Sequence, residues 1–272
     1  GHNTAIVIDR DGENRLFAQL SRAGFAPTYY ARFENGRVEG FLDGYRSLEP
    51  PEMGDPTLRP LIAARLREMH SLPSEAKRPT LYDTLDRWMA TARNIRFDDA
   101  RSQRHAALNL EHYAQLLADL RRSHDARMSP YESLGAREAL RPVLAHNDLL
   151  SGNILYNAST SDVRFIDYEY GACSYSAFDV ANHFCEYAGF DSDFDAHFPS
   201  AEVRRSFVAA YLGSGSTGRD IADFCRIVEE FIVPDHLFWG TWAVIQARYS
   251  DINFDFLGYA ELRLGALEPH GR

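Results

Sequence analysis

The sequence has 272 residues, 45% of them hydrophobic, with a formal net charge of -10 and a pI near 5.5. This length is sufficient to bury one large core or two lobes. The acidic balance argues against nucleic-acid binding and is compatible with attracting a cationic substrate. Three cysteines lack the spacing of a disulfide framework or a metal site, and there is neither a bilayer-spanning apolar run nor a secretory leader, so we expect a cytoplasmic protein without membrane insertion.

The first 24 residues are expected to form a strand, a turn and a helix. Ile6 to Ile8 have the composition of a strand, and the polar run from Asp9 to Gly12 is typical of a turn. A helix should follow, because apolar residues recur at helical spacing before the helix-ending Gly24: Leu16, Phe17, Leu20 and Ala23. Glu13 lies near the start of this helix, where a carboxylate is favourable.

A hairpin and a hinge are predicted next. The runs from Thr28 to Phe33 and from Arg37 to Leu42 resemble strands, and the Asn-Gly pair at 35–36 is a strong hairpin signal. Phe41, Leu42 and residues 43–51 are interpreted as a hinge whose backbone amides could meet an adenine edge. We therefore predict a small nucleotide-binding unit over residues 1–46 and a helical unit over residues 47–272.

The rest of the chain is predominantly helical in pattern. Apolar stripes at helical spacing predict core-facing helices over residues 58–69, 81–95, 108–120, 203–212 and 221–249. The polar stretch from Ser123 to Pro142 is expected to be irregular. It leads into the segment that carries the chemistry.

The polar core of that segment consists of His146, Asp148, Asn153 and Asp167. The spacing His-x-Asp-x-x-x-x-Asn resembles the catalytic loop of protein-kinase-like enzymes, and an Asp after an apolar strand resembles their metal-binding Asp. On this reading Asp148 takes the proton of an acceptor hydroxyl. Asn153 and Asp167 offer the oxygen ligands that Mg²⁺ prefers, and Glu169 is a candidate further ligand. Alternatively, these are ordinary turn-forming loop residues.

Polar residues at helical spacing follow this segment. Asp179, Asn182, His183 and Glu186 are three or four residues apart, so most of them share one helix face. That face is either solvated or part of a buried network that braces the catalytic loop. We interpret the first three as bracing residues and Glu186 as a substrate contact.

Large aromatic residues cluster in the last third of the chain. Trp239 and Trp242 share a helix face, and Phe254, Phe256 and Tyr259 follow closely. Such a cluster is either ordinary core or an aromatic box for an ammonium group. The pattern alone leaves both open.

Three segments together resemble the choline and ethanolamine kinases: residues 146–154, 165–170 and 177–186. The resemblance covers nearly the whole chain. It implies an α+β, protein-kinase-like fold of two lobes, a small β-containing N-lobe that is truncated here and a large helical C-lobe, with ATP and Mg²⁺ as cofactors. It also implies that Glu13 is the helix Glu of the family. The implied ammonium pocket consists of Trp239, Trp242, Phe254 and Tyr259, with Tyr170 and Glu186 alongside. The implied adenine hinge consists of Glu39, Gly40, Phe41 and Leu42.

Within that family the chain is more similar to ethanolamine kinases, on residues 149–150, 165, 168, 186–189 and 246–256. The resemblance implies phosphorylation of ethanolamine to phosphoethanolamine, the first step of phosphatidylethanolamine synthesis by the CDP-ethanolamine route, and a homodimer. The alternatives are a choline kinase and a catalytically silent kinase-like binding protein. Because residues 1–10 resemble the family from the end of its third strand, we expect the phosphate-covering hairpin and the basic partner of Glu13 to lie outside this sequence.

Overall fold

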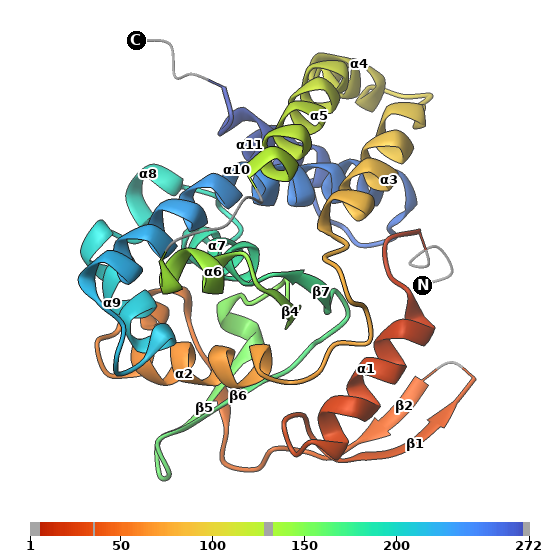
Figure 1. Cartoon of the computed structure of the whole chain (residues 1–272). Coiled ribbons are helices and arrows are strands. Elements are labelled where there is room, and N and C mark those ends of the chain that lie inside the picture. The colour runs from red at the N-terminus through yellow and green to blue at the C-terminus, as the bar shows by residue number, and fades with distance from the viewer. Residues whose placement is uncertain (1–5, 35, 128–132, 269–272) are drawn as a thin grey trace.

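The structure, a computed structural model, describes residues 6–34, 36–127 and 133–268 (Figure 1). Its N-terminal elements are α1 (Arg10–Arg22), β1 (Tyr29–Phe33), β2 (Gly36–Glu39) and β3 (Arg46–Ser47). The predicted hairpin is confirmed, because β1 and β2 pair antiparallel with Phe33 opposite Gly36. Asn35 itself lies outside the described residues. In Figure 1, α1 and this hairpin stand together at one side of the mainly helical remainder.

Two predictions for this part are wrong. Residues 6–8 form no strand, because a strand requires a hydrogen-bonded neighbour. Val7 and Ile8 instead lie in the turn and short connection that lead into α1, with their side chains buried. The turn expected from Asp9 to Gly12 is the first turn of α1. Asp9 is its N-cap, and the Asp9 side chain accepts a hydrogen bond of 2.9 Å from the Gly12 amide.

Two further antiparallel sheets frame the segment that carries the chemistry. One has the strand order β3, β5 (Ile154–Asn157), β6 (Asp162–Phe165), and the other pairs β4 (Pro142–Ala145) with β7 (Ala172–Tyr175). The loop from residue 146 to 153, which includes the short 3-10 helix η3 (Ser151–Asn153), connects β4 to β5. The connection from β6 to β7 carries Asp167. Both connections therefore run between the same two sheets.

Helices form most of the remaining structure. In chain order they are η2 (Pro50–Gly54), α2 (Leu58–His70), α3 (Leu81–Asn94), α4 (Arg101–Ala107), α5 (Leu110–Arg127), α6 (Leu134–Ala139), α7 (Ser176–Cys185), η4 (Glu186–Ala188), α8 (Phe194–His197), α9 (Ala201–Leu212), α10 (Gly218–Tyr249) and α11 (Phe256–Gly265). The long helix α10 begins with a capping box between Thr217 and Asp220 and packs against α3, α6, α7, α9 and α11. The α+β class is as predicted.

The helical predictions are largely confirmed, with three differences. Leu108 does not belong to the third predicted helix, because it caps α4. Helix α4 was not predicted, and none of its residues is buried, so it has no apolar stripe to detect. The stretch expected to be irregular contains the end of α5 and all of α6; residues 128–132 lie outside the described residues. The division after residue 46 stays a prediction.

Among the described helices, none is both long and apolar enough to pass through a lipid bilayer.

Candidate active site

The catalytic loop is held in place by one buried carboxylate on α7. Asp179 accepts hydrogen bonds of 2.7 Å from the backbone amides of both His146 and Asn147, and it lies 2.8 Å from Nε2 of His70. Burial favours a raised pKa for Asp179, but these hydrogen bonds outweigh it, so that the pKa is lowered and the carboxylate stays charged. No role for His70 is predicted from the sequence, because its partner Asp179 lies 109 positions away in the chain.

Two more α7 side chains brace the same loop. Asn182 Oδ1 accepts a hydrogen bond of 2.9 Å from the amide of Leu149, and His183 Nδ1 lies 3.0 Å from the Leu149 carbonyl oxygen. All of these groups are fully buried. The predicted bracing role of Asp179, Asn182 and His183 is therefore confirmed, and it fixes the loop against a rigid helix.

Asp148 and Asn153 lie next to one another. The side-chain nitrogen of Asn153 donates to the backbone carbonyl oxygen of Asp148 at 2.8 Å and to the Asp148 carboxylate at 3.2 Å. This leaves Asn153 Oδ1 as an acceptor for another ligand. Burial raises the pKa of Asp148 well above its usual range, and the carboxylates of Glu186, Asp167 and Glu169 raise it further.

Asp167 follows β6 in a left-handed backbone conformation, with φ of 62°. The neighbouring Ile166 ties this turn to the catalytic loop, because its amide donates to the Asn153 carbonyl at 3.0 Å and its carbonyl lies 2.9 Å from His146 Nε2. The backbone of Asn153 therefore lies next to the residue that precedes Asp167, and the shared metal-binding role of the two side chains stays a prediction. Burial also raises the pKa of Asp167.

The oxygen donors of this region suit a hard cation. Carboxylates that raise one another's pKa repel each other, and a divalent cation bound between them would offset that repulsion. Within the described ranges, no three His, Cys, Asp or Glu side chains could hold a metal ion by themselves. Proteins bind Mg²⁺ through one or two carboxylates together with substrate phosphates.

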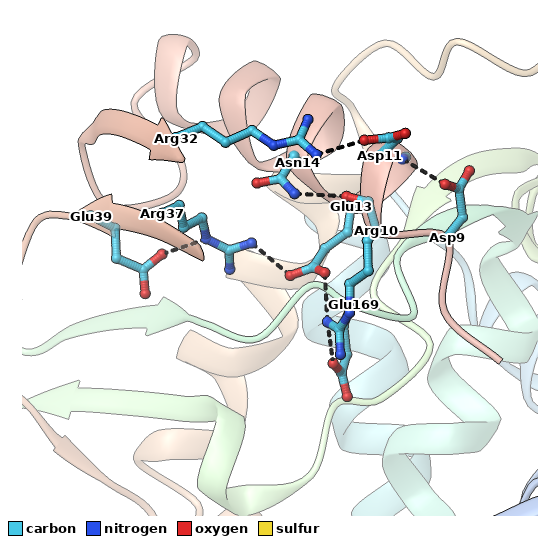
Figure 2. A network of polar contacts seen from close by, with 10 residues as sticks. Asp9, Arg10, Asp11, Glu13, Asn14, Arg32, Arg37, Glu39 and Glu169 are labelled. Carbon is cyan, nitrogen blue, oxygen red and sulfur yellow. Dashed lines mark hydrogen bonds and ion pairs between the residues drawn. The ribbon is translucent and has the colours of Figure 1, made fainter. Parts of the chain in front are cut away.

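Arginines pair with the carboxylates of Glu13 and Glu169, and Arg10 contacts both of them (Figure 2). Arg10 donates to Glu13 at 2.7 Å and to Glu169 at 3.0 Å. Arg37, on β2, donates to Glu13 at 2.6 Å and to Glu39 at 3.1 Å. Glu13 thus has two basic partners within this sequence, and the hairpin folds Arg37 back over α1, a contact that no local pattern shows. That a further basic partner lies on a strand preceding this sequence stays a prediction.

The predicted hinge lies at the end of β2. The strand ends at Glu39, earlier than predicted, and the Gly40 amide donates to the Thr28 carbonyl at 2.8 Å. Phe41 is 90% exposed and Leu42 is partly buried. The adenine-binding role of Glu39 to Leu42 stays a prediction.

A cavity of about 490 Å³ opens beside Asp148. It is lined by all seven predicted substrate residues, Asp148, Tyr170, Glu186, Trp239, Trp242, Phe254 and Tyr259, and also by Leu150, Glu169, Phe190, Gln246, Ile252 and Phe256. We call it the substrate cavity. Its rings meet at an angle: the Trp239 ring lies 5.2 Å from the Tyr170 ring and 5.4 Å from the Trp242 ring. The indole of Trp242 donates to the Tyr170 hydroxyl at 2.7 Å.

Glu186 is the buried acid of the substrate cavity. Burial raises the pKa of Glu186 to about 7, although the nearby guanidinium of Arg263 acts in the opposite direction. Arg263, on α11, is 1% exposed; it donates to Glu186 at 3.4 Å and also contacts Asp235. Neither Arg263 nor Asp235 is predicted from the sequence as part of the site. No local signal singles out Arg263, because α11 also carries Glu261, a charged residue that lies at the surface.

Comparisons with known proteins agree with this geometry. The sequence model of the family described as choline/ethanolamine kinase matches residues 1–267. Ethanolamine kinase 1 of Mus musculus is 35% identical over 97% of this chain and 73% of its own length. A probable choline kinase 3 of Arabidopsis thaliana is 32% identical over 97% of this chain and 74% of its own length.

Among solved structures, an ethanolamine kinase of Plasmodium vivax matches 98% of this chain and 73% of its own chain, with a TM-score of 0.85 and 29% identity. The chain thus spans about three quarters of each of these relatives. The match of sequence and fold runs through the catalytic loop and the substrate cavity alike. The chain therefore belongs to the choline/ethanolamine kinase family.

Proposed function

We propose that this chain catalyses the ATP- and Mg²⁺-dependent phosphorylation of ethanolamine to phosphoethanolamine. The observation that carries the proposal is the composition of the substrate cavity. The cavity brings the candidate base Asp148, the buried carboxylate of Glu186 and the rings of Trp239 and Trp242 around one space. A small amino alcohol offers one hydroxyl to phosphorylate and one ammonium group to bind.

Each end of ethanolamine has a counterpart in the cavity. Glu186 accepts hydrogen bonds from the ammonium group, whose positive charge also favours the ionised form of this carboxyl. The aromatic faces around it stabilise a cation further. The hydroxyl is then directed to Asp148, whose carboxylate lies near Glu186.

The reaction requires Asp148 to accept the proton of the hydroxyl as the oxygen attacks the γ-phosphorus. The bond from the γ-phosphorus to the β,γ-bridging oxygen breaks, and ADP leaves. A raised pKa suits Asp148 to this proton transfer, because a base whose pKa lies nearer to the working pH accepts a proton more readily. Mg²⁺, when bound with ATP, neutralises charge on the transferred group. We assign Asn153 and Asp167, with Glu169 alongside, to hold it, and Glu13 and the segment from Glu39 to Leu42 to the nucleotide.

Choline is the second candidate substrate, because the many ring faces of the cavity also suit a quaternary ammonium group. The two substrates differ in what they require. A primary ammonium needs hydrogen-bond acceptors, whereas the trimethylated one cannot donate to Glu186. The buried Glu186 therefore favours ethanolamine.

The test is the release of ADP with Mg²⁺ and ATP, measured with ethanolamine and with choline in parallel. A higher kcat/KM with ethanolamine supports the proposal. A higher value with choline assigns the chain to choline phosphorylation by the same residues. Absence of turnover with both would favour a silent kinase-like binding protein.

We also propose a cytoplasmic location and a homodimer, both supported by the family resemblance. Light scattering of the purified protein tests the second, and fractionation of the source cells tests the first.

A further inference from the structure

The carboxylate of Asp235 lies behind the substrate cavity and connects its two ends. Asp235 belongs to α10 and is fully buried. One of its side-chain oxygens accepts a hydrogen bond of 3.1 Å from Asn182, which in turn accepts from the amide of Leu149 in the catalytic loop. The other oxygen accepts from Arg263, the partner of Glu186. Asp235 therefore acts on the substrate cavity through its neighbours.

The guanidinium of Arg263 is held in one place and is shared unequally. Its central carbon lies 5.5 Å from the ring centre of Phe194 and 5.8 Å from that of Tyr259, and it donates to the Tyr259 hydroxyl at 3.2 Å. Its contact with Asp235 is direct, whereas it reaches Glu186 only at 3.4 Å, beyond the usual length of such a hydrogen bond. Asp235 is thus the main partner of this cation.

The charges of this buried group do not cancel. When Glu186 is ionised, Glu186 and Asp235 carry two negative charges and Arg263 carries one positive charge, which leaves a net charge of -1. Burial raises the pKa of Glu186 to about 7, and the charge of Asp235 acts in the same direction. An uncompensated charge is unfavourable in a buried position. A monovalent cation in the substrate cavity would complete the group.

Other titratable groups also face Glu186, but none of them is a cation. They are Tyr259 on α11, Cys185 on α7, and Asp148, Glu169 and Tyr170 in the wall of the substrate cavity. The charge that Glu186 offers to a ligand therefore depends on how Arg263 is divided between the two carboxylates.

We propose that Asp235 is a positioning residue for the ammonium group of the substrate, because it holds Arg263 and so leaves the negative charge of Glu186 for that group. Without the charge of Asp235, Arg263 would pair with Glu186, and the two would neutralise each other. The ammonium group would then have to compete with a buried guanidinium for the same carboxylate. This inference rests on the proposed function for the identity of the cation.

Asp235→Asn tests the proposal, because it removes the charge and keeps an oxygen that can accept from Asn182. Asp223→Asn is the matched control on the same helix, where Asp223 pairs with Arg219 at 3.8 Å near the surface. The first readout is a carbon-13 NMR titration of the Glu186 carboxyl in the ligand-free protein, with the signal assigned by its loss in Glu186→Gln. Its midpoint should lie near 7 in the wild type and the control. In Asp235→Asn it should fall towards the ordinary glutamate pKa of about 4.3.

The second readout is calorimetric titration with ethanolamine in the absence of ATP, at about pH 8, where the Glu186 carboxyl is mostly ionised. Asp235→Asn should raise the Kd for ethanolamine at least about tenfold, the scale of a lost charged hydrogen-bond partner, whereas the control should bind as the wild type does. The kcat at saturating ethanolamine should change only a few-fold, because the hydrogen bond to Asn182 can persist.

Three results would overturn the proposal: an unchanged Glu186 midpoint in Asp235→Asn, an unchanged Kd for ethanolamine, or a loss of kcat at constant Kd. The last result would limit Asp235 to bracing the catalytic loop. If Asp235→Asn does not fold, the smaller neutral variant Asp235→Ser carries the same two expectations. If the wild type does not bind ethanolamine, the proposed function fails, and the titration of Glu186 still decides the role of Asp235 because it requires no ligand.

Discussion

Arg263 donates a hydrogen bond of 3.4 Å to Glu186 from a position that is almost completely buried. The same guanidinium contacts Asp235 and the Tyr259 hydroxyl. One buried cation thus compensates two buried carboxylates, and one of these lines the substrate cavity. The charge of the ammonium site is consequently compensated in part by a residue outside the cavity lining.

Replacement of Arg263 by Gln should destabilise the fold by about 3–5 kcal/mol, because it leaves Asp235 and Glu186 without their counter-charge. Urea unfolding measures this loss. Arg104→Gln is the matched control, since Arg104 pairs with Asp255 and Glu261 on the surface, and it should cost about 1 kcal/mol or less. Equal losses in the two variants would contradict the role assigned to burial.

Replacement of Glu186 by Gln should weaken ethanolamine more than choline. The variant removes a charged acceptor that the primary ammonium uses, a loss of about 1.5–3 kcal/mol, or roughly ten- to a hundredfold in KM. The KM for choline should change only a few-fold. Glu261→Gln, an exposed carboxylate on α11, serves as control. Similar losses for the two substrates would refute this description of the pocket.

The same carboxyl predicts a pH dependence. The pKa of Glu186 is raised to about 7 in the free protein, so its ionised form becomes dominant only above that pH. The kcat/KM for ethanolamine should therefore rise with pH through about 7, and Glu186→Gln should remove this step. A profile that is unchanged in the variant would assign the step to another group.

Replacement of Asp148 by Asn should lower kcat by at least about 10²–10⁴-fold while preserving the fold. Its stability profile is also diagnostic. Because the pKa of Asp148 is raised in the folded state, the folded protein keeps the proton of this carboxyl up to a higher pH than the unfolded chain does. Wild-type stability should accordingly fall as the pH rises above the ordinary carboxyl pKa, and the variant should lack that decline. Urea unfolding from pH 4 to 8 tests this, and a parallel decline in both proteins would contradict it.

The sequence predicted what local patterns encode. The Asn-Gly pair located the hairpin, apolar periodicity located most long helices, and the polar spacing of α7 predicted that Asp179, Asn182 and His183 brace the catalytic loop. These features depend on residues close together in the chain. They can therefore be recognised in the sequence without knowledge of the tertiary structure.

Long-range pairings were missed. Arg37 reaches Glu13 only after the hairpin folds back, and Arg263 reaches Glu186 from 77 positions away. The strand expected from Ile6 to Ile8 failed for a related reason, since β composition does not supply a pairing partner. Phe190 and Gln246 also line the substrate cavity, and their spacing in the sequence does not predict this because tertiary packing brings them there.

Asp179 offers a test of how far the loop geometry depends on one side chain. Asp179→Asn can no longer accept from both backbone amides, and its new amide group faces donors, so Asp148 should shift and kcat should fall by roughly 10²-fold. The pKa of Asp179 is lowered in the fold, so its contribution to stability is present above the ordinary carboxyl pKa and is lost as the pH falls. The variant should lose that acid-dependent part of the unfolding free energy. Asp99→Asn, at an exposed carboxylate, should leave kcat unchanged. If Asp179→Asn retained full kcat, the conformation of the catalytic loop would depend on the flanking strands β4 and β5 and not on Asp179.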